Sequence, residues 1–274
     1  MKQFSDTQAL RCAREQLSGT LALVPTMGSL HEGHLSLIRH AQSVADHVCV
    51  SIYVNPLQFG PNEDFDRYPR DIQADIQALE SLNVQWLWTP KYQDLYPSEH
   101  PVKITVPHLD HQYCGASRPG FFTGVATVVY RLFQNLRPDL AVFGEKDYQQ
   151  LLVIRHMVKD LDLGVDIQSH EIVREASGLA MSSRNQYLSD AEREAAASIY
   201  KGLSAAMRQF ETGERDAKVL LATARAALHA HLDVEYLDIV DADLNPVSTV
   251  ESGNRCLIAV HLGSTRLIDN ICFS

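Results

Sequence analysis

Apolar residues in the first half of this chain follow two alternating patterns. Four segments are apolar almost without interruption: residues 21–24, 48–54, 84–88 and 140–143. Uninterrupted apolar runs of this length predict strands buried on both faces, as the strands of parallel sheets are. A further short strand is predicted at 102–106, between Pro101 and Pro107. The sequence therefore predicts a sheet whose two faces are both covered.

Between these runs, apolar residues recur every three or four positions, which is the spacing of one face of a helix. This spacing is carried by Leu35, Ile38 and Ala41 in segment 35–44, and by Ile72, Ile76 and Leu79 after the expected N-cap Asp71. Further helices are predicted at 125–136 and 148–161. Because strands that alternate with helices build right-handed βαβ units, we predict an α/β fold with a Rossmann-like, doubly wound parallel sheet.

The pattern changes in the second half of the chain. Ser189 and Glu192 have the spacing of a capping box at the start of an alanine-rich helix. A second helix is predicted at 217–231, and strands at 234–240, 256–261 and 266–270. Two helices beside short strands indicate a smaller C-terminal α+β domain. We therefore predict two domains, residues 1–176 and 177–274.

Composition narrows the class of protein. The chain has 274 residues and 45% of them are hydrophobic, which is enough for a sizeable core and too many for a disordered protein. Its formal net charge of −10 argues against a nucleic-acid partner, because phosphate backbones attract basic surfaces. The cysteines lack framework spacing, the first residues lack the apolar core of a signal peptide, and no window approaches about 20 apolar residues. We expect a cytoplasmic protein without a membrane partner.

The most informative segment is His31-Glu32-Gly33-His34, an H-x-G-H motif. It follows the first predicted strand through Pro25-Thr26-Met27-Gly28-Ser29-Leu30, and we expect the strand to end at Pro25 and a helix to begin near the histidines. Their spacing directs both rings to one place. Free N–H groups and the dipole at a helix N-terminus attract anions. The motif therefore predicts a site for a nucleotide and its phosphates.

Two simpler interpretations compete with this one. A His-x-x-His pair on a helix often has no function beyond the surface or the core. Zinc is the other alternative, but the zinc-protease pattern needs the second histidine four residues after the first, and here the spacing is three. The five cysteines are scattered without metal-ligand spacing. Zinc is therefore disfavoured.

Two polar clusters directly follow predicted strands. Asn55 and Gln58 come after segment 48–54, and Lys146 and Asp147 come after segment 140–143. Ligands bind at the carboxyl ends of strands in open α/β sheets. The amides are therefore placed to recognise a small polar substrate, and Lys146 and Asp147 to contact a phosphate and a ribose. Each cluster is also compatible with an ordinary turn.

The loop Met181-Ser182-Ser183-Arg184-Asn185 supplies hydroxyls and a guanidinium. These groups hold polyphosphate oxygens through charge-assisted hydrogen bonds. The alternative is a solvated linker between the two domains. Because the chain has neither a Walker A motif nor a Gly-x-Gly-x-x-Gly motif, any nucleotide is bound without those devices.

Taken together, these motifs resemble those of the pantoate–β-alanine ligase family. The resemblance rests on residues 25–28, 31–34, 54–59, 68–70, 143–150, 181–185 and 262–270, and it runs from about Leu23 to Asn270. It implies kinship with nucleotidylyltransferases and class I aminoacyl-tRNA synthetases, in which a His-x-Gly-His motif and a later loop share the phosphates. It also implies a homodimer.

The reaction that the resemblance implies is the ATP-dependent condensation of pantoate with β-alanine through a pantoyl adenylate. Mg²⁺ is expected mainly on the ATP phosphates, with Asp75 as a candidate helper. ATP binding is assigned to Met27, Gly28, Ser29, Leu30, His31, Glu32, Gly33, His34, Gly144, Glu145, Lys146, Asp147, Val173, Met181, Ser182, Ser183 and Arg184. Catalysis is assigned to His31, His34, Lys146, Ser182 and Arg184, with His34 as the proton donor. Gln58 and Gln150, supported by Asn55, are assigned to pantoate and β-alanine.

One position departs from the family pattern, which usually reads Arg-Pro-x-His-Phe-x-Gly-Val. Here Phe121 stands where the histidine is expected, while Arg118, Phe122, Gly124 and Val125 match. The change removes an imidazole near the pantoate end of the expected site. It bears on substrate affinity more than on the class of reaction.

Two other functions are weighed against this one. An enzyme that joins a different nucleotide to a phosphorylated acceptor, as cytidylyltransferases do, would need additional basic residues, whereas Asn55, Gln58 and Gln150 are neutral. A non-catalytic nucleotide-binding module would have no use for an acceptor pocket beside two phosphate loops. Release of pyrophosphate distinguishes an enzyme from such a module.

Overall fold

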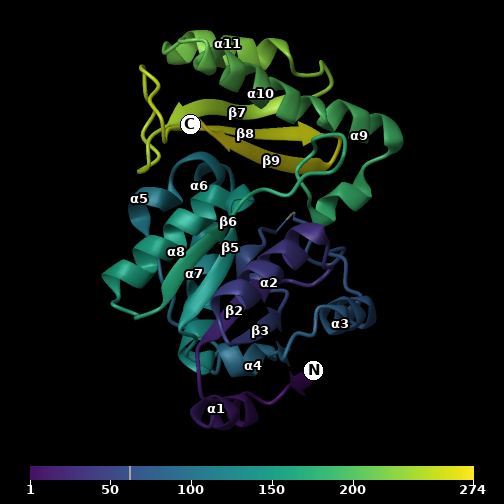
Figure 1. The fold of residues 1–274 in the computed structure, drawn as a ribbon, viewed down its shortest axis with the longest axis vertical. Coiled ribbons are helices and arrows are strands. Elements are labelled where there is room, and N and C mark those ends of the chain that lie inside the picture. Colours follow the sequence, from purple (N-terminus) through teal and green to yellow (C-terminus); the bar gives the residue numbers. More distant parts are fainter. Residues whose placement is uncertain (62) are drawn as a thin grey trace. The chain divides into compact units, whose positions relative to one another are not determined.

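The structure is a computed structural model that describes residues 1–61 and 63–274. The chain divides into two compact units, which we call unit 1 and unit 2 (Figure 1). Unit 1 comprises Met1–Glu145 and Gln149–Glu171, and unit 2 comprises Lys146–Tyr148 and Ile172–Ser274. The chain thus contributes three residues to unit 2, returns to unit 1, and later enters unit 2 again. The predicted domain limits at residues 176 and 177 stay a prediction.

Unit 1 consists of a six-stranded parallel sheet and its helices. The strands are β1 Lys2–Phe4, β2 Leu21–Thr26, β3 His47–Ile52, β4 Trp86–Trp88, β5 Leu140–Gly144 and β6 Asp166–His170. The helices are α1 Thr7–Glu15, α2 Glu32–Val44, α3 Ile72–Ser81, α4 Tyr92–Leu95, α5 Pro107–Asp110, α6 Tyr113–Ser117, α7 Phe121–Leu136 and α8 Tyr148–Asp160, with the 3-10 turns η1 Pro56–Gln58 and η2 Glu145–Asp147. The first residue of α8 and the last two of η2 are counted in unit 2.

The order of strands in this sheet is β1-β4-β3-β2-β5-β6, and every pairing is parallel. The predicted doubly wound parallel sheet is therefore confirmed. The order reverses at the β2/β5 pair, because the chain moves outward to β3 on one side and to β6 on the other. Ligands of such sheets bind outside the carboxyl ends of the strands at this reversal. The segments that follow β2 and β5 therefore occupy the expected position of a site.

Both faces of the sheet are buried, as the uninterrupted apolar runs predicted. On one face, alternate strand residues such as Val24, Val50 and Val142 pack against Ile38 of α2 and Leu79 of α3. The residues between them on the strands, including Leu23, Cys49 and Phe143, are also buried. A sheet covered on both faces presents its polar groups at the ends of its strands.

Three details of the prediction for unit 1 are wrong. Strand β2 continues through Pro25 to Thr26, because β5 pairs with it only at Ala22 and Leu23 and a proline is tolerated where one side of a strand is open. Segment 102–106 forms no strand: Val102 is 78% exposed, and the Ile104 amide donates to Thr127 Oγ1 (2.9 Å) instead of to a ladder. Ile72 was expected on the buried apolar face of α3, but it is 41% exposed.

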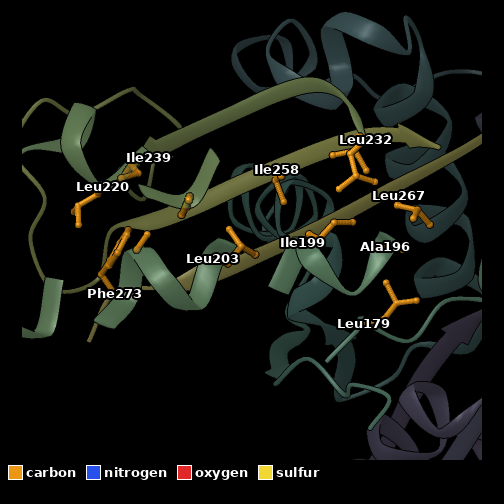
Figure 2. Packing of buried hydrophobic residues seen from close by; sticks show 14 of the residues in the cluster. Leu179, Ala196, Ile199, Leu203, Leu220, Leu232, Ile239, Ile258, Leu267 and Phe273 are labelled. Carbon is orange, nitrogen blue, oxygen red and sulfur yellow. The ribbon is translucent and has the colours of Figure 1, made fainter. Parts of the chain in front are cut away.

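Unit 2 has a three-stranded antiparallel sheet in the order β7-β8-β9 and three main helices. Its elements are η3 Ser183–Tyr187, α9 Asp190–Ala196, α10 Ser198–Glu211, α11 Ala217–Ala226, β7 Asp233–Val240, β8 Arg255–Leu262 and β9 Thr265–Cys272. Its core lies between the sheet and the helices, where Leu203 and Leu220 pack with Ile258 and Phe273 (Figure 2). The predicted smaller α+β region is confirmed.

The helix ends of unit 2 test two local predictions. Ser189 and Glu192 form the predicted capping box at the start of α9. The helix predicted at 217–231 is too long, because α11 ends at Ala226 and the His229 amide donates to Ser198 Oγ at 2.9 Å. In the described part of the chain, no helix combines the length and the hydropathy that crossing a membrane requires.

Candidate active site

The loop after β2 is held by a buried carboxylate of α3. Asp75 accepts the amide hydrogens of Ser29 (3.0 Å) and Leu30 (2.7 Å), one on each carboxylate oxygen. Gly28 has a φ of +80°, and a Cβ there would lie 2.8 Å from Asp75 Oδ2. Burial raises the pKa of Asp75, and the two backbone hydrogen bonds oppose this rise. The predicted helper for Mg²⁺ therefore already has both oxygens engaged in fixing the loop.

The two histidines of the H-x-G-H motif lie side by side where α2 begins. His31 is the N-cap and His34 is the third helical residue, and their ring centroids are 4.1 Å apart. The amide of His31 donates to Nδ1 of His34 at 3.4 Å. Since Nδ1 accepts this hydrogen, a neutral His34 carries its proton on Nε2. The N-terminus of α2 thus combines a dipole that attracts anions with a polarised N–H donor.

Asn55 and Gln58, which the sequence singled out after β3, differ in how much of their hydrogen-bonding capacity is used. Asn55 is 1% exposed, and its Nδ2 donates to Gln58 Oε1 and to the carbonyl of Gly124, both at 3.1 Å. Its Oδ1 accepts from the Leu57 amide (3.3 Å) and the Tyr96 hydroxyl (2.9 Å). All four hydrogen bonds of the Asn55 amide are therefore made within the protein.

Gln58 keeps capacity for a ligand. Its Nε2 donates to Sδ of Met27 at 3.1 Å, and its Oε1 accepts from Asn55. One N–H and one lone pair of the Gln58 amide are not used in these two bonds. Gln58 is 9% exposed, so the residue as a whole is largely buried. The contact with Met27 joins the amide cluster to the loop that leads into His31.

The start of α7 packs closely against η1. A Cβ added to Gly124 would lie 2.2 Å from the carbonyl oxygen of Leu57, so only glycine permits this approach. Beside it is a cavity of about 510 Å³ in unit 1, lined by Leu57, Gln58, Phe59, Gly60, Pro61, Glu63, Lys103, Ser117, Arg118, Pro119, Gly120, Phe121, Thr123, Gly124 and Thr127. The departure from the family pattern, Phe121, is thus a wall of a cavity that Gln58 also lines.

The sheet edge at β5 contributes Gly144 and Glu145 in unit 1. Glu145 accepts a hydrogen bond from the Ser169 hydroxyl at 3.0 Å. Gln149, at the start of α8, is buried and bonded to the Leu109 and Gln112 carbonyls (2.8 and 2.9 Å). Its neighbour Gln150 is partly buried. The side chain of Gln149 therefore has a structural role, and Gln150 is the residue of α8 that is left as a candidate for binding a ligand.

Within unit 2, the segment Lys146–Tyr148 is held by the C-terminal sheet. Asn270 of β9 donates from Nδ2 to the carbonyl oxygen of Lys146 at 3.1 Å. The guanidinium of Arg255 lies 4.1 Å from the centroid of the Tyr148 ring. The Nζ of Lys146 is 4.0 Å from Oδ2 of the neighbouring Asp147, and the Lys146 side chain is 20% exposed. The predicted phosphate-binding lysine therefore has a fixed backbone and an accessible ammonium.

The second predicted phosphate loop is also assembled in unit 2. The Met181 amide donates to the Val173 carbonyl at 3.0 Å, so Val173, which was assigned to ATP binding, and the start of the loop are adjacent. Ser182 caps η3 and accepts from the Arg184 amide at 3.3 Å, and Ser183 is buried. A capped 3-10 turn with a buried serine thus forms this loop.

Sequence reasoning missed the residues that support this loop. Arg174 forms a two-point ion pair with Asp269 of β9, at 2.6 and 3.0 Å, and lies 3.8 Å from the centroid of the Tyr200 ring. Asp269 is 4% exposed. The available signal was an acidic residue within the predicted strand 266–270, since buried carboxylates need a partner.

The structure thus assembles the predicted residues into two groups, one in each unit. Met27, His31, His34, Asn55 and Gln58 are joined in unit 1, and Lys146, Asp147, Val173 and Met181–Arg184 belong to unit 2. Within the described residues there is no group of three or more His, Cys, Asp or Glu side chains that could hold a metal ion.

Comparison with known proteins identifies relatives over nearly the whole chain. The family model described as pantoate-beta-alanine ligase matches residues 1–272. A pantothenate synthetase of Sphingopyxis alaskensis is 49% identical over 94% of this chain and 94% of its own length. A pantothenate synthetase of Aquifex aeolicus is 49% identical over 91% of this chain and 90% of its own length.

Solved structures agree with the sequence relatives. A pantothenate synthetase from Thermus thermophilus has a TM-score of 0.94 and 42% identity, with 99% of both chains covered. A pantoate-beta-alanine ligase from Francisella tularensis, in complex with beta-gamma ATP and beta-alanine, has a TM-score of 0.82 and 35% identity, covering 99% of this chain and 97% of that one.

Proposed function

The chain belongs to the pantoate-beta-alanine ligase family and makes pantothenate, and from this premise we propose how its own residues carry out the reaction. It is an amide-forming ligase whose substrates are pantoate, β-alanine and ATP. A free carboxylate is a poor electrophile, so the carboxyl group of pantoate must be activated before an amine attacks it. ATP supplies that activation.

The proposed reaction has two steps. In the first, a carboxylate oxygen of pantoate attacks the α-phosphorus of ATP, the bond to the β-phosphate oxygen breaks, and pyrophosphate leaves. In the second, the amine of β-alanine attacks the acyl carbon of pantoyl adenylate, the bond to the phosphate oxygen breaks, and AMP and one proton leave. Both steps depend on alignment and on compensation of negative charge, which fixed donors provide.

In unit 1, we assign the phosphates of ATP to the N-terminus of α2. The rings of His31 and His34 are the assigned donors, and residues 27–34 form the surface around the phosphates. The amides of Ser29, Leu30 and His31 hold this surface in shape through Asp75 and His34. The hydrogen bond from the His31 amide to His34 Nδ1 supports a proton on His34 Nε2, which is the form that donates to a phosphate oxygen. Gly144 and Glu145 are assigned to the nucleotide at the end of β5.

Pantoate is assigned to Gln58 and Gln150, with β-alanine close to Gln58. Neutral amides suit a compact hydroxy acid, because each offers both a donor and an acceptor. Asn55 supports Gln58 and does not contact the substrate itself, since its four hydrogen bonds already go to the protein. The cytidylyltransferase alternative is disfavoured by the same pair of neutral amides.

In unit 2, Lys146 is assigned to the α-phosphate region and Ser182, Ser183 and Arg184 to the departing pyrophosphate. Asp147 is assigned to the ribose and the backbone of Val173 to adenine, with Met181 beside it. These groups supply one ammonium, one guanidinium and two hydroxyls where charge develops.

Magnesium is proposed to enter as part of the nucleotide substrate, coordinated by phosphate oxygens and water. Asp75 is the candidate protein contact, and its two bonds to the loop amides favour a role in holding Ser29 and Leu30 instead. We further propose a cytoplasmic homodimer, on the strength of the family resemblance and the composition of the chain.

The contact between Gln58 and Met27 is the observation that carries the proposal. It joins an amide with unused donor and acceptor capacity to the loop that leads into the two histidines. An acceptor site and a phosphate site are thereby adjacent within unit 1. A module that only senses a nucleotide needs no such pair of sites.

Isotope exchange tests the proposal directly. We would measure incorporation of labelled pyrophosphate into ATP with pantoate and Mg²⁺ present and β-alanine omitted. Exchange that depends on pantoate shows that a reversible adenylate forms before the amine arrives. If ATP binds and no exchange occurs, the two-step assignment is wrong and another acceptor or order of steps must be considered.

A further inference from the structure

Two adjacent residues of β9 hold both segments of unit 2 that we assign to the nucleotide. Asn270 binds the segment that contains Lys146, and Asp269 binds Arg174, which is next to Val173. Neither β9 residue is among those assigned to the substrates. Both are buried, with 2% of Asn270 and 4% of Asp269 exposed.

The amide of Asn270 acts as a bridge. Its Oδ1 accepts from Nη1 of Arg255 at 2.6 Å, and its Nδ2 donates to the carbonyl oxygen of Lys146 at 3.1 Å. Arg255 is opposite Cys272 and Asn270 is opposite Leu257, so Arg255 and Asn270 are diagonal neighbours on paired strands. The Arg255 bond fixes which end of the amide carries oxygen, because a guanidinium only donates. The NH₂ group therefore faces Lys146.

Arg255 contacts the same segment a second time. Its guanidinium lies 4.1 Å from the centroid of the Tyr148 ring, two residues after Lys146. The segment Lys146–Tyr148 is thus held at its backbone by Asn270 and at a side chain by Arg255. Within unit 2, these two contacts hold the backbone of Lys146 and the ring of Tyr148 against β8 and β9.

We propose that Asn270 is a positioning residue for Lys146, oriented by Arg255, and that it acts on catalysis only through that lysine. This inference rests on the proposed role of Lys146 at the phosphates. A backbone that is free to shift moves the ammonium relative to its target, and a displacement of about 1 Å costs up to about 100-fold in rate.

The variant N270D separates the two roles of the amide. A carboxylate still accepts from Arg255, but it cannot donate to the Lys146 carbonyl and repels it. We expect the rate of pantoate-dependent pyrophosphate exchange to fall by about 10- to 100-fold. The matched control is N245D, an amide-to-acid change in an exposed turn of the same unit, which should leave the rate unchanged.

A double-mutant cycle with K146A distinguishes positioning from general support of the fold. If Asn270 acts only through Lys146, N270D should lower the rate by no more than about 2-fold in the K146A background. An equal loss in both backgrounds, or no loss beside an intact Lys146, would overturn the inference while the role of Lys146 stands. A K146A variant with the parent rate would overturn the role of Lys146 and the inference together.

Thermal unfolding of each variant keeps this test interpretable. If N270D does not fold, N270S takes its place, because serine removes the Nδ2 donor without adding a charge. N270S should show the same dependence on Lys146. A similar loss in the N270S single variant and in its K146A double variant would again overturn the inference.

Discussion

The guanidinium of Arg118 stacks on the ring of Phe121, with its Cζ 3.5 Å from the ring centroid. The same guanidinium makes two hydrogen bonds of 2.6 Å to the carboxylate of Glu63. It also donates to the carbonyl of Gln58 at 3.3 Å. The residue that replaces the expected histidine therefore supports an arginine that contacts the backbone of a substrate-binding candidate.

Replacing Phe121 tests this stacking. F121L removes the aromatic face, and we expect the free energy of unfolding in urea to fall by about 0.5–1 kcal/mol. F121H should keep a ring at neutral pH but repel Arg118 when the imidazole is protonated, below about pH 6. Its stability should therefore drop on acidification more than that of F121L. Equal stability of F121L and the parent would show that the stacking contributes nothing.

His34 and Lys146 should be essential for the first chemical step. A charge-assisted hydrogen bond contributes about 1.5–3 kcal/mol, so H34A and K146A should each slow pyrophosphate exchange by about 10- to 150-fold. Their melting temperatures should stay close to that of the parent, because neither side chain belongs to the hydrophobic core. Parent-like turnover in both variants would contradict the assignment.

Asn55 and Gln58 should respond differently to truncation. Q58A removes the amide that still has capacity for a ligand, so KM for pantoate should rise while KM for ATP changes little. N55A leaves the hydroxyl of Tyr96 and the carbonyl of Gly124 without their partner in a buried site. We expect the unfolding free energy of N55A to fall by about 1–3 kcal/mol. Steady-state kinetics and urea unfolding of both variants measure the contrast, and identical behaviour would refute it.

The raised pKa of Asp75 predicts a pH dependence of stability. The folded protein binds the proton of Asp75 more tightly than the unfolded chain does. The contribution of Asp75 to the free energy of unfolding is therefore fully present at a pH below its ordinary pKa of 3.8. It is lost as the pH rises from there through the raised value. D75N should lack this part of the slope when unfolding is followed between about pH 4 and pH 7. Parallel stability curves for D75N and the parent would contradict it.

Gly124 should tolerate no side chain. Its missing Cβ would be 2.2 Å from the Leu57 carbonyl, so G124A must push α7 away from η1. We expect a loss of about 1–3 kcal/mol in unfolding free energy. The control is G144A, whose Cβ would meet nothing closer than 3.9 Å. If G124A is as stable as G144A, the close packing of η1 is not required.

Much of the fold could be predicted because its signals are local. The runs at 21–24 and 140–143 predicted β2 and β5, and Asp71 and Ser189 predicted two helix starts. Strands β1 and β6 were missed. Both lie at the edges of the sheet, where one side of a strand is open and polar residues are tolerated, as in the sequence Asp-Ile-Gln-Ser-His of β6. Edge strands therefore lack the apolar signature of central ones.

The site was predictable to a similar extent. The histidines and the amide cluster are short motifs that follow central strands, so their positions at the ends of those strands could be inferred from the sequence. The bridge from Asn270 to Lys146 was not visible, because it joins residues 124 positions apart and depends on the register of β8 and β9. No local pattern reports such a contact.

The division of the chain has a consequence for recombination between relatives. A cassette that begins at Ile172 looks like a natural unit to exchange, yet it leaves Lys146–Tyr148 behind with the recipient. The donor strand would then have to fit a segment that evolved beside a different partner. A chimera that exchanges residues 146–148 together with residues 172–274 receives this segment and the β9 strand that binds it from the same parent. Lys146 should then keep the position that it has in that parent.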